Sequence, residues 1–288
     1  MSLVETELTN RFTFEAFASH EFYTEINRSL VRQALAPFAR FPGAAPLTIV
    51  DMACGTGAVT RLIAEEMQRQ RQRARIIGVD PSAEALRRAA KWMGTLESNG
   101  ISTEFIQGDA EDLPRLVKNA NAAFFCNAIH LLPDKLAAFR LMSSILAPRG
   151  VFACNSGFYQ GTYIEGTDRF YRLWTNKAVR WLRKEHPEVR LSREAKAMAM
   201  QWMRADEYVD QLRRGGFDHI KATQEVGMIS IDAWRDIGHY WLFIEGALPG
   251  VPLEWGAAAL EKAVYQAGEE MGISATPRNW LQLIASKE

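Results

Sequence analysis

The sequence alternates apolar runs of strand length with amphipathic helical patterns over its first 156 residues. The runs lie at 47–52, 74–80, 103–109, 122–127 and 150–156, and the helical patterns lie at 58–70, 82–97 and 134–146. Continuous apolar strands separated by helices indicate a parallel sheet that is covered on both faces. A helix at 205–214 and strands near 218–226 and 279–285 follow. We therefore expect an α/β fold with a seven-stranded, mostly parallel sheet and helices on both faces.

The charge balance and the length of the apolar stretches argue against nucleic acid and membranes as partners of this protein. Lys plus Arg and Asp plus Glu number 34 each, so no net field attracts nucleic acid or an anionic membrane. The longest apolar stretches are too short to cross a bilayer, and the first residues lack a basic-then-apolar signal pattern. We expect a cytoplasmic protein without a nucleic-acid partner or a membrane span. The three cysteines lie far apart, which favours reduced thiols over a disulfide or a metal site.

The stretch IVDMACGTGAV, residues 49–59, is the first candidate for a ligand site. Asp51 lies at the end of an apolar strand, and Gly55 and Gly57 lead into a helix. In open α/β sheets, ligands bind beyond the carboxyl ends of the strands, where glycines let the backbone approach the ligand. A dinucleotide site would have a third glycine where Thr60 stands, and Asp51 would repel a diphosphate. The pattern therefore favours a ligand with a positive centre.

From this stretch onward, six motifs in order resemble those of the class I S-adenosylmethionine-dependent methyltransferases of the small-molecule type. VDMACGTG resembles the family's acid-x-Gly-x-Gly-x-Gly motif, with Ala53 in place of the first glycine. The segments IIGVDPS, QGDAEDLP, FFCNAIHLLPDK, LAPRGVF and GGF resemble the five motifs that follow. The resemblance covers roughly residues 45–226 and the last strand. It implies a Rossmann-like core, S-adenosylmethionine as cofactor and S-adenosylhomocysteine as product.

The resemblance also implies roles for individual residues. Asp51 would lie near the methionine ammonium group, Asp80 would bind both ribose hydroxyls, and Asp109 would lie near the adenine amino group. Asn127 and His130 would face the methyl group and its acceptor. The implied cofactor-binding residues are Asp51, Ala53, Gly55, Thr56, Gly57, Asp80, Pro81, Asp109, Ala110 and Asn127. From local sequence alone, Asp80 and Asp109 could instead be helix caps.

The methyl acceptor is predicted from the loop after the fourth strand and from two long insertions. The loop sequence CNAI differs from the Asp/Asn-Pro-Pro-aromatic motif that grips a flipped-out base. It offers too few carboxylates for a magnesium site, so no metal is expected. The insertions at 157–204 and 227–276 contain six of the eight tryptophans, which predicts either a lid over an apolar pocket or aromatic packing within the insertions. We expect an apolar small-molecule acceptor, methylated on oxygen or carbon.

Several side chains are candidates for a general base. His130 comes first, because it lies just past the fourth strand and histidine titrates near neutrality. A packing or capping role for His130 is an equal alternative. The other candidates lie in the predicted lid, and the sequence does not rank them securely: Tyr159, Glu165, His239, Tyr240 and Glu245. Of these, Tyr159 and Glu245 are taken as catalytic candidates beside His130.

The predicted organisation places the insertions outside a discontinuous core. An N-terminal helical cap covers 1–44, the core covers 45–156 and continues at 205–226 and 277–288, and the helical lid insertions cover 157–204 and 227–276. Two other function classes stay open. One is a methyltransferase-like partner protein that binds S-adenosylmethionine or S-adenosylhomocysteine without turnover. The other is an NAD(P)-dependent oxidoreductase, which Asp51 and Thr60 disfavour. The apolar insertions could also form a homodimer surface.

Overall fold

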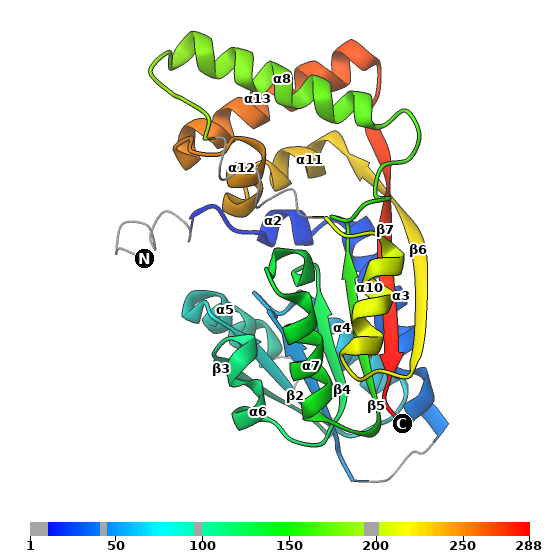
Figure 1. The fold of residues 1–288 in the computed structure, drawn as a ribbon. Coiled ribbons are helices and arrows are strands. Elements are labelled where there is room, and N and C mark those ends of the chain that lie inside the picture. Colours follow the sequence, from blue (N-terminus) through cyan, green and yellow to red (C-terminus); the bar gives the residue numbers. More distant parts are fainter. Residues whose placement is uncertain (1–10, 41–44, 95–99, 193–201) are drawn as a thin grey trace. The chain divides into compact units, whose positions relative to one another are not determined.

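The structure, a computed structural model, describes residues 11–40, 45–94, 100–192 and 202–288 (Figure 1). The chain forms two compact units. The sheet unit comprises Thr24–Tyr159, Met203–Glu225 and Trp280–Glu288. The helical unit comprises Met1–Tyr23, Gln160–Trp202 and Val226–Asn279. The chain therefore passes between the units several times, twice within a β-strand.

The described residues form one seven-stranded sheet. Its strands are β1 (Leu47–Met52), β2 (Ala74–Asp80), β3 (Ile101–Gln107), β4 (Ala120–Cys126), β5 (Leu146–Ser156), β6 (His219–Ser230) and β7 (Ala275–Ser286). They lie in the order β3-β2-β1-β4-β5-β7-β6. Neighbouring strands from β3 to β5 pair in parallel, whereas β7 runs antiparallel to β5. The predicted α/β fold with a mostly parallel seven-stranded sheet is confirmed.

Helices cover both faces of the sheet in the sheet unit (Figure 1). Their bounds are α3 (Glu21–Leu35), η1 (Ala36–Arg40), α4 (Ala58–Arg69), α5 (Ala83–Met93), η2 (Ala110–Asp112), α6 (Leu113–Leu116), η3 (Ile129–Leu131), α7 (Lys135–Ile145) and α10 (Ala205–Arg214). Successive residues of a strand point to opposite faces, so Phe124 packs with α3, α4 and α5 while Phe125 packs with α6, α7 and α10. Each face of the sheet therefore has its own apolar core.

Helix α3 belongs to the sheet unit from Thr24 onward. Leu30, Val31, Ala34 and Leu35 are almost fully buried in the core that α3 shares with α4 and α5. The sequence predicts a helical cap over 1–44, of which residues 1–10 and 41–44 lie outside the described residues. In the structure, the apolar stripe of α3 is part of the sheet unit's core.

The helical unit is built from α2 (Glu15–Ala18), α8 (Asp168–Glu185), α11 (Ile231–Ile237), α12 (Trp241–Ala247) and α13 (Leu253–Met271). Its interior is aromatic, with Phe170, Trp174 and Trp234 each at most 1% exposed. The ring centroids of Trp174 and Trp234 are 5.8 Å apart, and the Trp174 Nε1–H donates to the backbone oxygen of Leu260 on α13 at 2.8 Å. For these three aromatics, the packing alternative describes what the structure shows.

The three cysteines are buried and form no disulfide. Burial raises the pKa of the Cys54, Cys126 and Cys154 thiols far above its ordinary value, so they are protonated at neutral pH. Among the described helices, none is both long and apolar enough to cross a membrane.

Candidate functional site

The strand order identifies one edge of the sheet as a ligand site. From β1 the chain moves outward to β2 and β3 on one side, and then crosses back to β4 and β5 on the other. At such a topological switch point, the loops after the two central strands diverge and leave a crevice beyond the carboxyl ends of the strands. The predicted residues Asp51, Gly55 and Gly57 follow or end β1, and Asn127 and His130 follow β4. The fold therefore brings two of the sequence motifs to the same edge.

The loop after β1 has a left-handed backbone at three positions. Ala53, Gly55 and Gly57 have φ values of 53°, 54° and 85°. Alanine adopts this conformation only at a cost, which explains why a glycine would suit position 53. A Cβ added to Gly55 would have no heavy atom within 4 Å, whereas one on Gly57 would lie 3.2 Å from the Ala89 Cβ on α5. The loop thus presents bare backbone at Gly55 and packs tightly at Gly57.

Asp51 is a buried acid, with only 1% of its surface exposed. Its Oδ2 accepts a hydrogen bond from the Thr60 hydroxyl at 2.6 Å. The pKa of Asp51 is raised to about 7: burial is the largest cause, the Thr60 hydrogen bond opposes the rise, and the negative charge of Asp80 adds to it. Sequence reasoning treated Thr60 only as the place where a third glycine is missing, and the structure assigns it this contact.

Asp80 joins the loop after β1 to the end of β2. Its Oδ2 accepts the Gly55 N–H at 2.8 Å, and its Oδ1 accepts the Ser82 N–H at 2.9 Å. The side chain that caps helix α5 belongs to Ser82, which accepts from the Ala85 N–H at 3.2 Å. Burial raises the pKa of Asp80. The side chain that caps the helix is therefore Ser82, and the contact of Asp80 with the ribose stays a prediction.

The remaining cofactor candidates lie around this edge. Pro81 is exposed next to Asp80, and Thr56 is half-buried between the two glycines. Asp109 is exposed at the start of η2, where its N–H donates to the Asp112 carboxylate at 3.0 Å. Ala110 is half-buried and packs against the sheet's core. A capping role is thus present at Asp109, and its contact with adenine stays a prediction.

The loop after β4 holds two of the predicted residues. Asn127 has a φ of 58°, and its side chain bonds to Asn27 and Trp280. The Nδ1 atom of His130 lies 3.0 Å from the Ser156 hydroxyl oxygen, and its ring packs at a tilt against Phe158 with centroids 4.7 Å apart. Both residues therefore occupy fixed positions at the carboxyl ends of β4 and β5.

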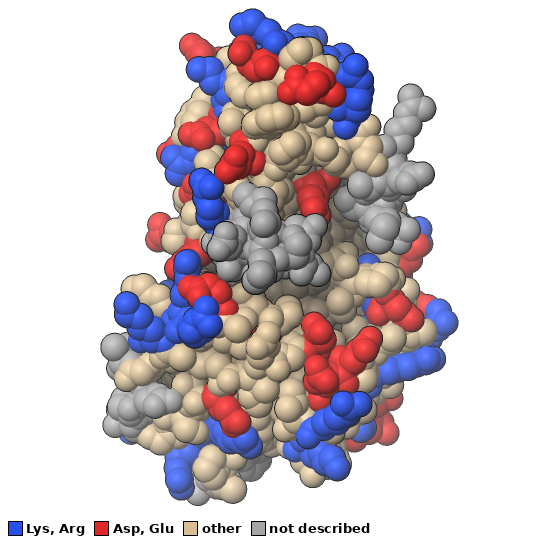
Figure 2. All heavy atoms as spheres, turned by 90° about the vertical axis from the view of Figure 1, so that its left-hand side faces the viewer, with Lys and Arg blue, Asp and Glu red and all other residues tan. Residues whose placement is uncertain are grey.

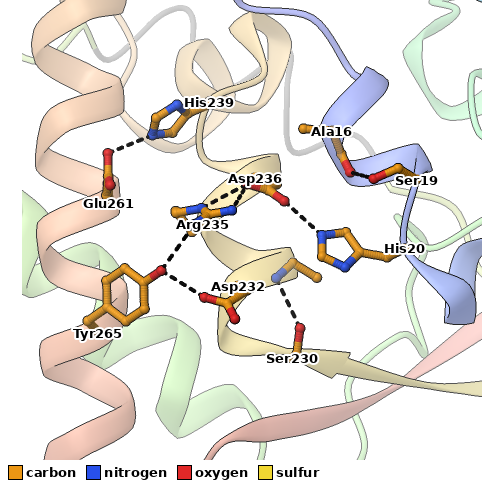
Figure 3. A network of polar contacts seen from close by, with 11 residues as sticks. Ala16, Ser19, His20, Ser230, Asp232, Arg235, Asp236, His239, Glu261 and Tyr265 are labelled. Atoms are coloured by element: carbon orange, nitrogen blue, oxygen red, sulfur yellow. Dashed lines mark hydrogen bonds and ion pairs between the residues drawn. The ribbon is translucent and has the colours of Figure 1, made fainter.

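The other catalytic candidates are either fully buried or located in the helical unit. Tyr159 has 0% of its surface exposed and lies within the apolar cluster under α7 and α10, which is the position of a core side chain. Glu245 lies on α12 in the helical unit, where partial burial raises its pKa. His239 pairs with Glu261 at 2.9 Å in the same unit (Figure 3). In the described part of the chain, no three His, Cys, Asp or Glu side chains gather as metal ligands would.

Comparisons with known proteins agree with this geometry. Residues 49–150 match a family model described as a methyltransferase domain. Among solved structures, YcgJ from Bacillus subtilis has a TM-score of 0.53 at 14% identity, covering 89% of this chain and 99% of its own. A proposed sarcosine dimethylglycine methyltransferase from Galdieria sulphuraria has a TM-score of 0.53 at 12% identity, covering 92% and 86%. The [4+2]-cyclase SpnF has a TM-score of 0.51 at 16% identity, covering 92% and 81%.

No curated protein sequence matches this chain. At these identities, the solved structures establish a shared fold. Residues 49–150 are similar to a methyltransferase domain, and the chain has the Rossmann-like fold of these structures.

Proposed function

We propose that this chain is an S-adenosylmethionine-dependent methyltransferase that acts on an oxygen or carbon of an apolar small molecule. The observation that carries the proposal is the charge of the crevice. Two buried carboxylates, Asp51 and Asp80, lie close enough that the charge of Asp80 raises the pKa of Asp51. A cationic ligand would relieve this repulsion, whereas the diphosphate of a nicotinamide dinucleotide would add to it.

The residues at this edge suit the cofactor. The open space next to Gly55 lets a ligand approach the backbone, and both carboxylate oxygens of Asp80 keep lone pairs in addition to their N–H partners. When bound, the cofactor would supply a methyl group on a sulfonium; the acceptor would attack the methyl carbon in line, and S-adenosylhomocysteine would leave as the thioether. Asp51 would hold the ammonium end, Asp80 the ribose, and Asp109 the adenine.

His130 is the proposed general base. If the Ser156 hydroxyl donates to the Phe158 oxygen at 3.3 Å, its own oxygen accepts from His130 Nδ1–H. This arrangement would fix the tautomer that has its lone pair on Nε2, the form that accepts a proton. Tyr159 and Glu245 are weaker proposals because the first is buried and the second lies in the helical unit.

An apolar acceptor is supported mainly by what the surface offers. On the face drawn in Figure 2, Lys and Arg side chains are interspersed with Asp and Glu side chains and do not form one basic surface. A nucleic-acid substrate would require such a surface. The aromatic content of the helical unit is compatible with an apolar acceptor, although its best-buried rings pack that unit's own core.

The fold alone does not prove methyl transfer. SpnF, a protein of the same fold, is described as a [4+2]-cyclase. Cofactor binding and turnover therefore need separate tests. Calorimetry with S-adenosylhomocysteine and with NAD tests binding, and we expect the first to bind and the second not to.

The site variant for this test is Asp80→Ala. It should lower the affinity for S-adenosylhomocysteine by roughly 10- to 150-fold. This range corresponds to the loss of about 1.5–3 kcal/mol from hydrogen bonds to a charged group. Asp206→Ala is the matched control, because Asp206 is an exposed acid of the sheet unit that pairs with Arg204. Binding of NAD alone, or equal S-adenosylhomocysteine affinity in both variants, would refute the proposed site.

Turnover is tested with cofactor carrying a labelled methyl group and a panel of apolar phenols and enols. Label should move into products that partition into organic solvent. Label that moves only into water-soluble amines would contradict the apolar acceptor, and cofactor binding without transfer to any acceptor would favour the non-catalytic alternative.

A further inference from the structure

Three asparagines and a tryptophan form a hydrogen-bonded network at the carboxyl ends of β4 and β5. Asn27 Oδ1 accepts from Asn127 Nδ2 at 3.0 Å and from Asn155 Nδ2 at 2.9 Å. Trp280 Nε1 donates to Asn127 Oδ1 at 2.8 Å. Asn27, Asn155 and Trp280 are at most 2% exposed. All four residues belong to the sheet unit, although they come from α3, the loop after β4, β5 and β7.

The network fixes the backbone of Asn127. Its N–H donates to both the side-chain oxygen and the backbone oxygen of Asn155, at 3.0 and 3.1 Å. Its φ of 58° lies in the left-handed region, which asparagine tolerates better than most residues. Buried amides that bond to one another in this way hold a single arrangement, because any member left without its partner would pay the cost of desolvation. The loop that begins at Asn127 therefore has one defined course.

The position of the network in the sheet tells which part of the ligand it borders. β4 is the direct neighbour of β1, with Phe124 opposite Asp51, while β2 and Asp80 lie on the far side of β1. Strands are spaced about 4.8 Å apart, so the end of β4 is roughly 10 Å from the end of β2. The network thus lies on the Asp51 side of the crevice, away from the acid assigned to the ribose.

We propose that Asn27, Asn155 and Trp280 are positioning residues, which hold the Asn127–His130 loop against the amino-acid half of the cofactor. The inference rests on the proposed function. In this proposal, the backbone of Asn127 borders the ligand, while its side chain bonds to Asn27 and Trp280. The N-terminal helix α3 and the last strand β7 each contribute one residue to the shape of the site.

The test compares two ligands on variants of Asn27. Asn27→Leu removes the shared acceptor, and Asn27→Asp keeps an oxygen in its place. S-adenosylhomocysteine contains the amino-acid half and adenosine lacks it, so a positioning role affects the first ligand only. We expect Asn27→Leu to bind S-adenosylhomocysteine at least tenfold more weakly than the wild type, with adenosine affinity within twofold and Asn27→Asp close to the wild type. Calorimetry measures the first ligand, and an NMR titration measures the second.

Other outcomes distinguish a failure of the proposed function from a failure of the positioning role. If wild-type protein binds no S-adenosylhomocysteine, the proposed function fails. If the wild type binds but Asn27→Leu loses both ligands equally, loses neither, or resembles Asn27→Asp, the positioning role is wrong. Should Asn27→Leu not fold, Trp280→Phe removes the N–H donor to Asn127 together with the outer ring atoms beside Gly157, and the same selective loss is expected of it.

Discussion

The two units surround their buried charges differently. The sheet unit buries two acids, Asp51 and Asp80, at the ends of adjacent strands. The helical unit buries a cation, Arg278, which is 2% exposed and lies 5.2–5.5 Å from the ring centroids of Tyr171, Tyr163 and Trp234. Aromatic faces stabilise a guanidinium without requiring a ligand, whereas two neighbouring buried acids repel each other. In the helical unit the buried cation packs against aromatic rings, whereas the two buried acids of the sheet unit lie side by side at the site proposed for the cofactor.

The first way to test this difference is to remove an aromatic ring from the helical unit. Trp234→Ala should lower the free energy of unfolding by about 3–5 kcal/mol, as large-to-small core changes do. Trp234 is 1% exposed, and its Nε1–H donates to Thr276 Oγ1 at 2.8 Å. Urea denaturation followed by circular dichroism measures the loss.

The matched control for this change is Trp92→Ala in the sheet unit. Trp92 is 66% exposed, so its loss should change stability by no more than about 0.5 kcal/mol. Similar losses from the two tryptophans would contradict a packing role for Trp234.

A second test addresses the charge of Asp51. Its pKa is raised above that of the unfolded chain, so the folded state holds a proton that the unfolded state releases. This contribution is fully present below about pH 4 and is lost as the pH rises through about 7. Asp51→Asn cannot ionise and keeps an acceptor for Thr60.

We therefore expect the wild type to lose up to a few kcal/mol of stability relative to Asp51→Asn between pH 5 and pH 8. Urea unfolding of both proteins at the two pH values measures this difference. Carboxylates whose pKa is lowered, such as Glu66, act in the opposite direction but equally in both proteins. Parallel pH dependences would show that Asp51 titrates normally.

A third test compares glycines that share a left-handed backbone. Gly57→Val in the sheet unit should cost about 1–3 kcal/mol of stability from backbone strain, and its side chain meets Ala89. It should also abolish S-adenosylhomocysteine binding. Gly166→Ala in the helical unit has a similar φ of 84° but open space for its Cβ, so it should keep binding intact. Calorimetry on both variants decides, and retained binding by Gly57→Val would refute the glycine-loop assignment.

Local sequence was sufficient for most of the sheet unit. The strands at 47–52 and 74–80 were predicted to the residue, because apolar runs and flanking helix signals bound them on both sides. The third strand was placed two residues late, since Asp109 looks like a strand end but begins η2. Strands β6 and β7 extend further than predicted, and their outer parts belong to the helical unit.

The parts of the site that sequence reasoning missed depend on distant contacts. Thr60 lies in the first turn of α4, and its hydroxyl donates to Asp51. Comparison with the glycine motif drew attention only to the glycine that is missing at this position. Asn27 lies 128 positions from Asn155, and neither residue stands in a motif. Tyr159 is a candidate base in the sequence because it lies in the predicted lid, yet in the structure its side chain is fully buried. Polar residues whose partners come from other elements leave no periodic signal in one sequence.

The smallest expected effect concerns two histidine–acid pairs of the helical unit (Figure 3). His20 Nε2 lies 2.8 Å from Asp236 Oδ2, with side chains 24% and 14% exposed. His239 pairs with Glu261 at 2.9 Å, with side chains 42% and 46% exposed. His20→Ala should cost about 1 kcal/mol, because Asp236 loses one hydrogen bond but keeps Arg235.

His239→Ala is the matched control and should cost less than about 0.5 kcal/mol, as exposed pairs do. Urea unfolding of the two variants measures both costs. His20 joins the segment before α3 to α11, and His239, in the turn after α11, joins that turn to α13. Both pairs therefore connect separate elements, and they differ chiefly in burial. If the two substitutions cost the same, burial does not set the strength of polar contacts in the helical unit. The two units would then differ in the charge of the groups that they bury, and not in how strongly burial affects a polar contact.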